Sequence, residues 1–198
     1  EMGLCKEYFI DDSFDIFSNA RMTLPKAGFK YGVNVNKEGG AEFVAVNLAN
    51  ELIELGHDSE IWLFEKRGAY LHNLDPRVCV RSLNCRRVRF LPLKLFFFLR
   101  KFSADQLIAH MWPYTSLITL TWLFSRNKAK LTVLEQVSVS DYLKREFNYS
   151  FWILKIIISI SHRLATNVVT ISRGTVKDLS QVMNIKEDKI KLINNPIV

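Results

Sequence analysis

Residues 37–57 read "KEGGAEFVAVNLANELIELGH", and this stretch decides the fold. Two adjacent glycines, Gly39 and Gly40, stand directly before an acidic residue and an amphipathic segment. Apolar residues then recur at the spacing that gives a helix one buried face: Val44, Leu48, Leu52 and Leu55. Gly56 follows as the left-handed cap of that helix.

Outward from this helix, strand-like and helix-like segments alternate along the chain. The predicted strands occupy residues 29–35, 59–65, 77–83, 105–111, 130–136 and 167–172, with a last one in "KIKLINNP". The predicted helices cover residues 41–55, a stretch that starts at Pro92, residues 112–124, one or two helices within 142–165, and 174–183. This alternation predicts an α/β fold, an open parallel sheet with helices on both faces, which binds ligands at the carboxyl ends of its strands.

Composition restricts the kinds of partner. The 198 residues suit one domain at residues 28–198, preceded by an extension at residues 1–27. A net charge of +7 predicts an anionic partner: nucleic acid, anionic lipid or a phosphorylated small molecule. The three cysteines lack CxxC spacing, so we expect reduced thiols in a cytoplasmic protein and no metal site.

No apolar segment reaches the length of a transmembrane helix. The best candidate, residues 147–165, is interrupted by Lys155 and is too short to span a bilayer. We interpret it as a buried core helix.

The two glycines lie between the first strand and the first helix, at the carboxyl edge of the predicted sheet. Without a Cβ, they would let a ligand approach the main chain, and the helix would offer it free N–H groups. Glu42 stands in the first turn, where the helix dipole favours a carboxylate. The alternative is a tight turn with a helix-stabilising Glu, and the glycines alone favour that alternative, since neither GxGxxG nor GxxxxGK[ST] is present.

Several segments, in order, resemble one enzyme family. "EGGAEFVAVNLANELIELGHDSEIWLFE", "ADQLIAHMWP", "KLTVLEQ" and "ATNVVTISRGTVKDLSQVMNIKEDKIKLINNPIV" are similar to the N-terminal half of family 4 glycosyltransferases. The resemblance covers residues 29–198 and depends on the ordered set, because no single motif decides it.

This resemblance implies the GT-B fold, in which two Rossmann-like domains face a cleft. The acceptor-side domain would be the one present, and a C-terminal domain absent from this chain would hold the nucleotide-sugar donor. The implied reaction is retaining transfer to a lipid-linked or glycan acceptor at the inner face of the cytoplasmic membrane. It uses no metal and no cofactor besides the nucleotide-sugar substrate.

The resemblance also assigns candidate catalytic residues: Glu135, Gln136 and His110. The family often has His after Glu at the fifth strand, whereas this chain has Gln136, which can hydrogen-bond but cannot titrate. His110 could partly substitute for it. The alternative for His110 is a hydrogen-bonded histidine at a strand edge.

Other residues at the same edge are candidates for acceptor or phosphate binding: Gly39, Gly40, Glu42, Trp112, Arg173 and Gly174. For Arg173, an equal alternative is that Ser172 caps the helix and the Arg side chain is simply exposed. Asn195 and Pro196 would form the hinge between the two domains.

Residues 86–102, "RRVRFLPLKLFFFLRKF", interleave cations with large apolar groups and suit an anionic membrane surface. The candidate membrane contacts are Arg86, Arg87, Arg89, Phe96, Phe97, Arg100 and Lys101. The alternative is a helix that packs one face on the sheet and leaves its cations in water. Aromatics on a helix argue against nucleic acid as the partner.

Two function classes therefore remain. The first is a glycosyltransferase of cell-surface polysaccharide, lipopolysaccharide or glycolipid synthesis. The second is a non-catalytic, membrane-associated binding module with a degenerate site, which Gln136 favours. A dinucleotide-binding domain is a distant third.

Overall fold

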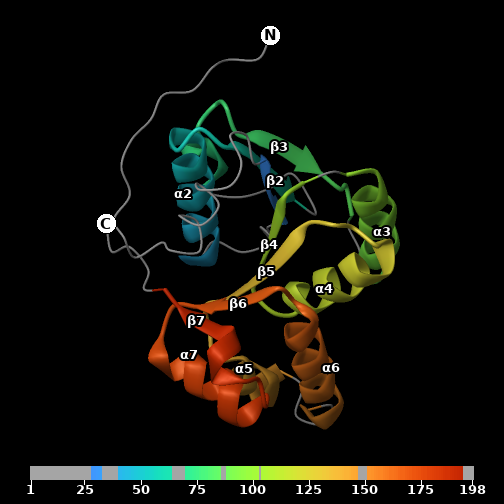
Figure 1. The fold of residues 1–198 in the computed structure, drawn as a ribbon, viewed down its shortest axis with the longest axis vertical. Coiled ribbons are helices and arrows are strands. Elements are labelled where there is room, and N and C mark those ends of the chain that lie inside the picture. The colour runs from blue at the N-terminus through green and yellow to red at the C-terminus, as the bar shows by residue number, and fades with distance from the viewer. Residues whose placement is uncertain are drawn as a thin grey trace.

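A computed structural model describes residues 28–32, 40–63, 70–85, 88–102, 104–146 and 151–193. Seven strands form one sheet in the order β3-β2-β1-β4-β5-β6-β7, and every pairing is parallel (Figure 1). The strands are β1 Gly28–Gly32, β2 Asp58–Leu63, β3 Cys79–Ser82, β4 Gln106–His110, β5 Lys130–Glu135, β6 Asn167–Thr170 and β7 Ile190–Leu192. The predicted open parallel sheet is confirmed, and its strand order reverses between β1 and β4.

The helices follow the predicted positions with small shifts at their ends. The α-helices are α2 Gly40–Glu54, α3 Leu91–Lys101, α4 Tyr114–Ser125, α5 Val139–Glu146, α6 Phe151–Leu164 and α7 Arg173–Lys177. Short turns complete the set: η2 Leu71–Asn73, η3 Val88–Phe90, the π-helical η5 Asp178–Val182 and η6 Glu187–Lys189. The helix predicted at 174–183 is therefore α7 continued by η5.

Alternation along the strands builds a core on each face of the sheet. Leu107 and Ala109 of β4 pack with α3, α4 and α6, whereas Ile108 between them packs with α2. The same division separates Leu131 and Val133 of β5 from Leu134. The helices α3, α4 and α6 accordingly lie on one side of the sheet and α2 on the other (Figure 1). We call the former the three-helix layer.

Two predicted helix ends are confirmed. Gly56 has φ +79°, the left-handed conformation of a helix C-cap, and the His57 N–H donates to the Leu52 carbonyl at 2.9 Å. Ser172 caps α7, since its Oγ accepts a hydrogen bond from the Thr175 N–H at 3.1 Å.

The prediction of a buried core helix at residues 147–165 is wrong for one whole side of α6. Six of its large apolar residues are exposed: Trp152, Ile153, Ile156, Ile157, Ile160 and Leu164. Ser161 and His162, in contrast, are completely buried. Hydrophobicity alone misassigns this helix because hydrogen bonds, described below, fix which side faces the protein.

Several predictions lie outside the described residues. These are the extension at residues 1–27 and the roles of Gly39, Arg86, Arg87, Asn195 and Pro196. Within the described ranges, no helix combines the length and the apolar character that crossing a membrane requires.

Candidate functional site

The candidate site lies at the carboxyl edge of four adjacent strands. Gly40 begins α2 in the connection after β1, His110 ends β4, Gln136 follows β5, and Arg173 begins α7 after β6. These strands are neighbours in the order β1-β4-β5-β6. Because all strands run parallel, segments that are distant in sequence meet at one edge of the sheet.

His110 and Gln136 approach each other on the α2 side of this edge. His110 is buried, and its Nδ1 lies 3.5 Å from Gln136 Nε2. Burial lowers the pKa of His110 from 6.5 to about 4, because the charged imidazolium would lose its hydration. His110 is therefore neutral near pH 7 and can contribute hydrogen bonds rather than charge.

Glu42 is buried in the first turn of α2, near the same edge. Its Oε1 accepts a hydrogen bond from the Tyr70 N–H at 3.0 Å, so it holds the chain that enters η2. No hydrogen bond from a residue that the structure describes reaches Oε2. A buried carboxylate oxygen in this position can accept a hydrogen bond from a further donor.

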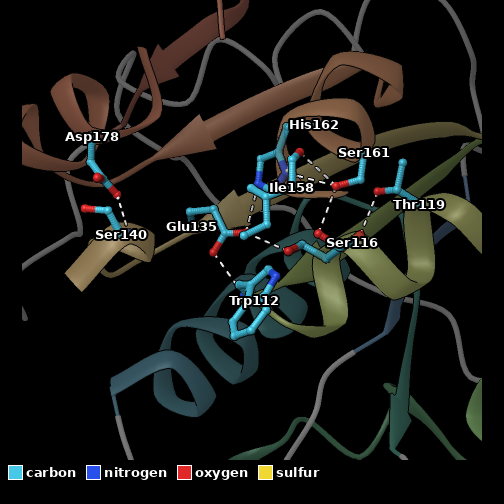
Figure 2. A network of polar contacts seen from close by, with 10 residues as sticks. Trp112, Ser116, Thr119, Glu135, Ser140, Ile158, Ser161, His162 and Asp178 are labelled. Atoms are coloured by element: carbon cyan, nitrogen blue, oxygen red, sulfur yellow. Dashed lines mark hydrogen bonds and ion pairs between the residues drawn. The ribbon is translucent and has the colours of Figure 1, made fainter. Parts of the chain in front are cut away.

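Glu135 occupies the other side of the sheet and is completely buried. Its Oε2 accepts from the Trp112 N–H at 3.0 Å, and its Oε1 accepts from Thr115 Oγ1 at 2.6 Å (Figure 2). Oε1 also lies 3.0 Å from His162 Nε2. The carboxylate thus binds the turn between β4 and α4 and sits at the N-terminus of α4, where the helix dipole favours negative charge.

The His162 imidazole connects Glu135 to helix α6. Its Nε2 faces the Glu135 carboxylate, and its Nδ1 lies 3.0 Å from the Ile158 carbonyl oxygen. Ser161 Oγ also lies 3.3 Å from Nδ1, so this nitrogen can donate to the Ile158 carbonyl or accept from the serine, depending on the tautomer. The imidazole thus links the Glu135 side chain to the backbone of α6.

A pair of serines extends the same network. Ser161 Oγ lies 2.8 Å from Ser116 Oγ of α4 and donates to the Ile158 carbonyl at 3.0 Å (Figure 2). All of these side chains are buried. The sequence pattern did not single out His162, Ser161 and Ser116; the available signal was the polar pair at 161–162 inside a mostly apolar helix.

The geometry gives Glu135 a positioning role. Along β5, Glu135 shares the face of Leu131 and Val133, which points into the three-helix layer and not toward His110. Its contact with Trp112 fixes the turn directly after His110. The Trp112 ring is also buried and packs edge-on against Tyr142, with 5.5 Å between ring centroids. A direct catalytic role for Glu135 stays a prediction.

The start of α7 leaves room beside its main chain. Arg173 and Gly174 are both exposed. A Cβ built on Gly174 would meet only Ser172 Oγ, at an ordinary 3.7 Å, so packing within the described protein does not require a glycine here. Ser172 caps this helix as one alternative expected, and Arg173 extends from its first turn.

The basic, aromatic segment is a half-buried surface helix. Leu91, Leu95 and Leu99 of α3 pack inward, as one alternative expected. Phe97, Arg100 and Lys101 are exposed, and so is Arg89, whereas Phe96 is half-buried with the Arg100 guanidinium 5.6 Å from its ring centroid. Among the described residues, no cluster of three or more His, Cys, Asp or Glu side chains could hold a metal ion.

Comparison with known proteins adds a family and a fold. The profile of Glycosyltransferase Family 4 matches residues 38–198, which is most of the chain. A search of curated proteins found no match.

Solved structures share the fold at low identity. HepE of Anabaena, solved in complex with UDP, superposes with a TM-score of 0.63 at 17% identity over 86% of this chain and 44% of that one. The lipopolysaccharide outer core galactosyltransferase WaaB gives 0.57 at 16% identity over 87% and 46%. MurG of Acinetobacter baumannii gives 0.57 at 14% identity over 86% and 46%.

These likenesses show the fold, which is the Rossmann-like N-terminal half of the GT-B architecture. The chain spans less than half the length of each of these structures.

Proposed function

This chain belongs to glycosyltransferase family 4, and from that membership we propose that it forms the acceptor-side half of a sugar-transferring enzyme. The reaction moves a sugar from a nucleotide-sugar to a lipid-linked or polysaccharide acceptor in cell-surface glycan synthesis. The anomeric configuration is retained. A second domain, continuing after the hinge at Asn195 and Pro196, holds the donor.

One observation carries this proposal. The segments that the family resemblance selected follow four adjacent strands, β1, β4, β5 and β6, and so share one edge of the sheet. This edge is where an open parallel sheet binds ligands. Two relatives support the same chemistry, since HepE was solved with UDP and WaaB is a galactosyltransferase.

The residues at this edge have different proposed roles in binding the two substrates. His110 is neutral and Gln136 lies beside it, so the pair offers hydrogen-bonding groups to sugar hydroxyls without adding charge. Arg173 carries a permanent positive charge next to Gly174 and suits the phosphates of the donor. Glu42 and Gly40 contribute on the acceptor side, together with Gly39.

Glu135 acts through Trp112 in this proposal. Its carboxylate accepts from the Trp112 N–H and so orients the turn that follows His110. Because His110 and Gln136 are uncharged, the charge that develops during transfer would be stabilised by Arg173 and by the donor's own phosphates. That division fits retaining transfer that uses the donor phosphate, rather than a protein side chain, as the base.

The decisive experiment measures sugar transfer by the protein in its full natural length. Arg173→Gln should lower kcat/KM for the nucleotide-sugar by about tenfold or more, because it removes a charge-assisted phosphate contact worth roughly 1.5–3 kcal/mol. Lys177→Gln, at the end of the same short helix, is the control with the same charge change. Equal effects of the two variants would contradict the role given to Arg173.

The second candidate is the non-catalytic, membrane-associated binding module, favoured by Gln136 in place of the family's His. Full-length protein that binds vesicles yet transfers no sugar from a panel of nucleotide-sugars would establish this alternative.

Peripheral attachment at the inner face of the cytoplasmic membrane completes the proposal. The exposed Arg89, Phe97, Arg100 and Lys101 of η3 and α3 are the supporting groups that the structure describes. Cations flanking exposed aromatic side chains suit the headgroup region of anionic lipid.

A further inference from the structure

Helix α6 turns two polar side chains inward, beside the buried Ile158, and most of its large apolar side chains outward. Trp152, Ile153 and Ile156 are 71%, 65% and 58% exposed, whereas Ser161 and His162 are completely buried. An ordinary surface helix of a soluble protein has the opposite arrangement. The outer side of α6 therefore needs an apolar environment that the described part of the chain does not supply.

Hydrogen bonds hold this orientation. His162 contacts the Glu135 carboxylate, and Ser161 contacts Ser116. Turning the helix to bury its isoleucines would break both contacts and deprive buried polar atoms of these hydrogen bonds, which is unfavourable. The exposed apolar side is therefore fixed by the fold.

The neighbouring helices continue the same surface. Eleven of the fifteen large hydrophobic side chains that are exposed in the described residues belong to this layer: three on η3 and α3, two on α4 and six on α6. Leu93 and Phe97 are exposed on α3, and Phe124 is 72% exposed on α4. Because α4 packs against both α3 and α6, the three helices that carry these side chains are neighbours in one layer (Figure 1).

Charge on this face has a single sign. Residues 88–101, 114–130 and 151–164 contain no Asp or Glu, although the chain has 20 acidic residues. Each range contains cations, for example Arg100, Lys128 and Lys155. An apolar face with cations and no carboxylates complements the negative surface of an anionic lipid bilayer.

The same charges disfavour a second copy as the occupant. In a two-fold dimer the same face packs against itself, so the cations of one copy would oppose those of the other. Like charges placed opposite each other are unfavourable at an interface. An anionic lipid surface has no such conflict.

We propose that the outer face of α3, α4 and α6, which we call the lipid-facing surface, docks on anionic lipid with α6 lying in the membrane interface. Trp152 suits the headgroup level, where tryptophan is enriched, and the Lys155 ammonium lies 5.2 Å from its ring centroid. The Lys155 stem can run along the apolar surface while its charge reaches the lipid phosphates.

The lipid-facing surface also explains access to an acceptor, and this part rests on the proposed function. Helix α6 ends at Leu164, just before β6 begins, so its first turn lies toward the carboxyl ends of the strands. Trp152 is consequently near the end of the molecule that carries the candidate site. A lipid-linked acceptor could then reach that edge without leaving the bilayer.

Vesicle co-sedimentation tests the proposal on the protein in its full natural length. Phosphatidylcholine vesicles with and without phosphatidylglycerol are the probes. Ile153→Ser/Ile156→Ser should weaken binding to the anionic vesicles by about tenfold or more, because two apolar side chains leave the interface. Leu192→Ser, which changes an exposed residue of β7, is the matched control and should bind as the unchanged protein does.

Two charge-reversal variants provide a second, independent test. Lys155→Glu should weaken binding roughly thirtyfold, since it reverses one charge at the surface. Lys191→Glu makes the same change in net charge on β7, where Lys191 is exposed on the α2 side of the sheet, and should have little effect. Melting temperatures of all variants confirm that each protein is folded.

Each remaining outcome has a definite meaning. Unchanged vesicle binding in the α6 variants would overturn the proposal. The proposal would also be overturned if the α6 variants lost self-association in lipid-free sedimentation velocity but kept their vesicle binding. The face would then be an interface between copies of the protein. Transfer to a water-soluble acceptor is measured separately, so that lipid binding without transfer rejects the proposed function alone, and transfer without lipid binding rejects the lipid-facing surface alone.

Discussion

The two sides of helix α6 differ in a way that reverses the usual rule for a soluble protein. The inner side contributes Ser161 and His162 to a completely buried hydrogen-bonded network, and the outer side presents Trp152, Ile153 and Ile156 to the surroundings. The inner groups each have a named partner. The outer groups are exposed, and the cation beside them is Lys155, whose ammonium lies near the Trp152 ring.

This difference teaches which contacts set the orientation of the helix. Polar contacts and apolar burial act together on the inner side. Ser161 is hydrogen-bonded to Ser116, and His162 contacts Glu135. Ile158 on the same side is completely buried in the core. Turning the helix would disrupt all of these contacts at once, so the outer apolar side is left for a partner.

The largest expected effect comes from breaking the inner side. His162→Ala should lower the free energy of unfolding by about 3–5 kcal/mol, because it removes a completely buried ring together with its contacts to Glu135 and the Ile158 carbonyl. The melting temperature should fall by about 10 °C or more. His72→Ala, in the exposed turn η2, is the control and should stay within about 0.5 kcal/mol. Equal stability of the two variants would show that the inner network does not hold the helix.

The pH dependence of stability tests a different buried histidine, His110. The folded state holds the pKa of His110 at about 4 through burial, against 6.5 when exposed. Between these values the unfolded state binds more protons, so this stabilisation is complete above 6.5 and is lost as the pH falls toward 4. The loss amounts to roughly 3 kcal/mol at most.

Urea unfolding at a series of pH values measures this effect. His110→Gln should flatten the stability curve over that interval, and His72→Gln should leave the curve unchanged. An unaltered slope in His110→Gln would mean that another group titrates.

A smaller effect is expected from the two serines. Ser116→Ala and Ser161→Ala should each cost about 1–2 kcal/mol, since each removes the hydrogen bond between two buried hydroxyl groups. The double variant should cost less than the sum of the single ones. A double-mutant cycle by urea unfolding checks this, and strict additivity would argue against a direct contact.

The smallest effect belongs to the outer side. Ile156→Ser should change the free energy of unfolding by no more than about 0.5 kcal/mol, because the residue is 58% exposed. Ile158→Ser, two positions along and completely buried, should cost several times more in the same urea experiment. Comparable losses in both variants would mean that α6 buries its outer side in solution.

The fold was predictable because it depends on local patterns. The alternation of apolar segments predicted the seven parallel strands, and Gly56 and Ser172 predicted two helix ends correctly. Such signals lie within a few residues of each other, so the sequence alone reveals them.

The side to which a residue points was harder to predict. Glu135 was predicted as a catalytic candidate, which stays a prediction; it shares a strand face with Leu131 and Val133, an alternation that the sequence already contained. His162 had no recognisable spacing because its partner lies 27 residues away on another element. The exposed side of α6 was missed since hydrophobicity averaged over a helix does not reveal its rotation.

The most direct test of this account is a nitroxide scan along residues 152–164 of the protein in its full natural length, with and without anionic vesicles. The account predicts mobile, solvent-accessible labels at positions 153, 156 and 160, and immobile labels at 158, 161 and 162. Adding vesicles should make the first group accessible to oxygen and protected from water-soluble relaxation agents. Immobile labels at 153, 156 and 160 without lipid, with mobile ones at 161 and 162, would contradict it.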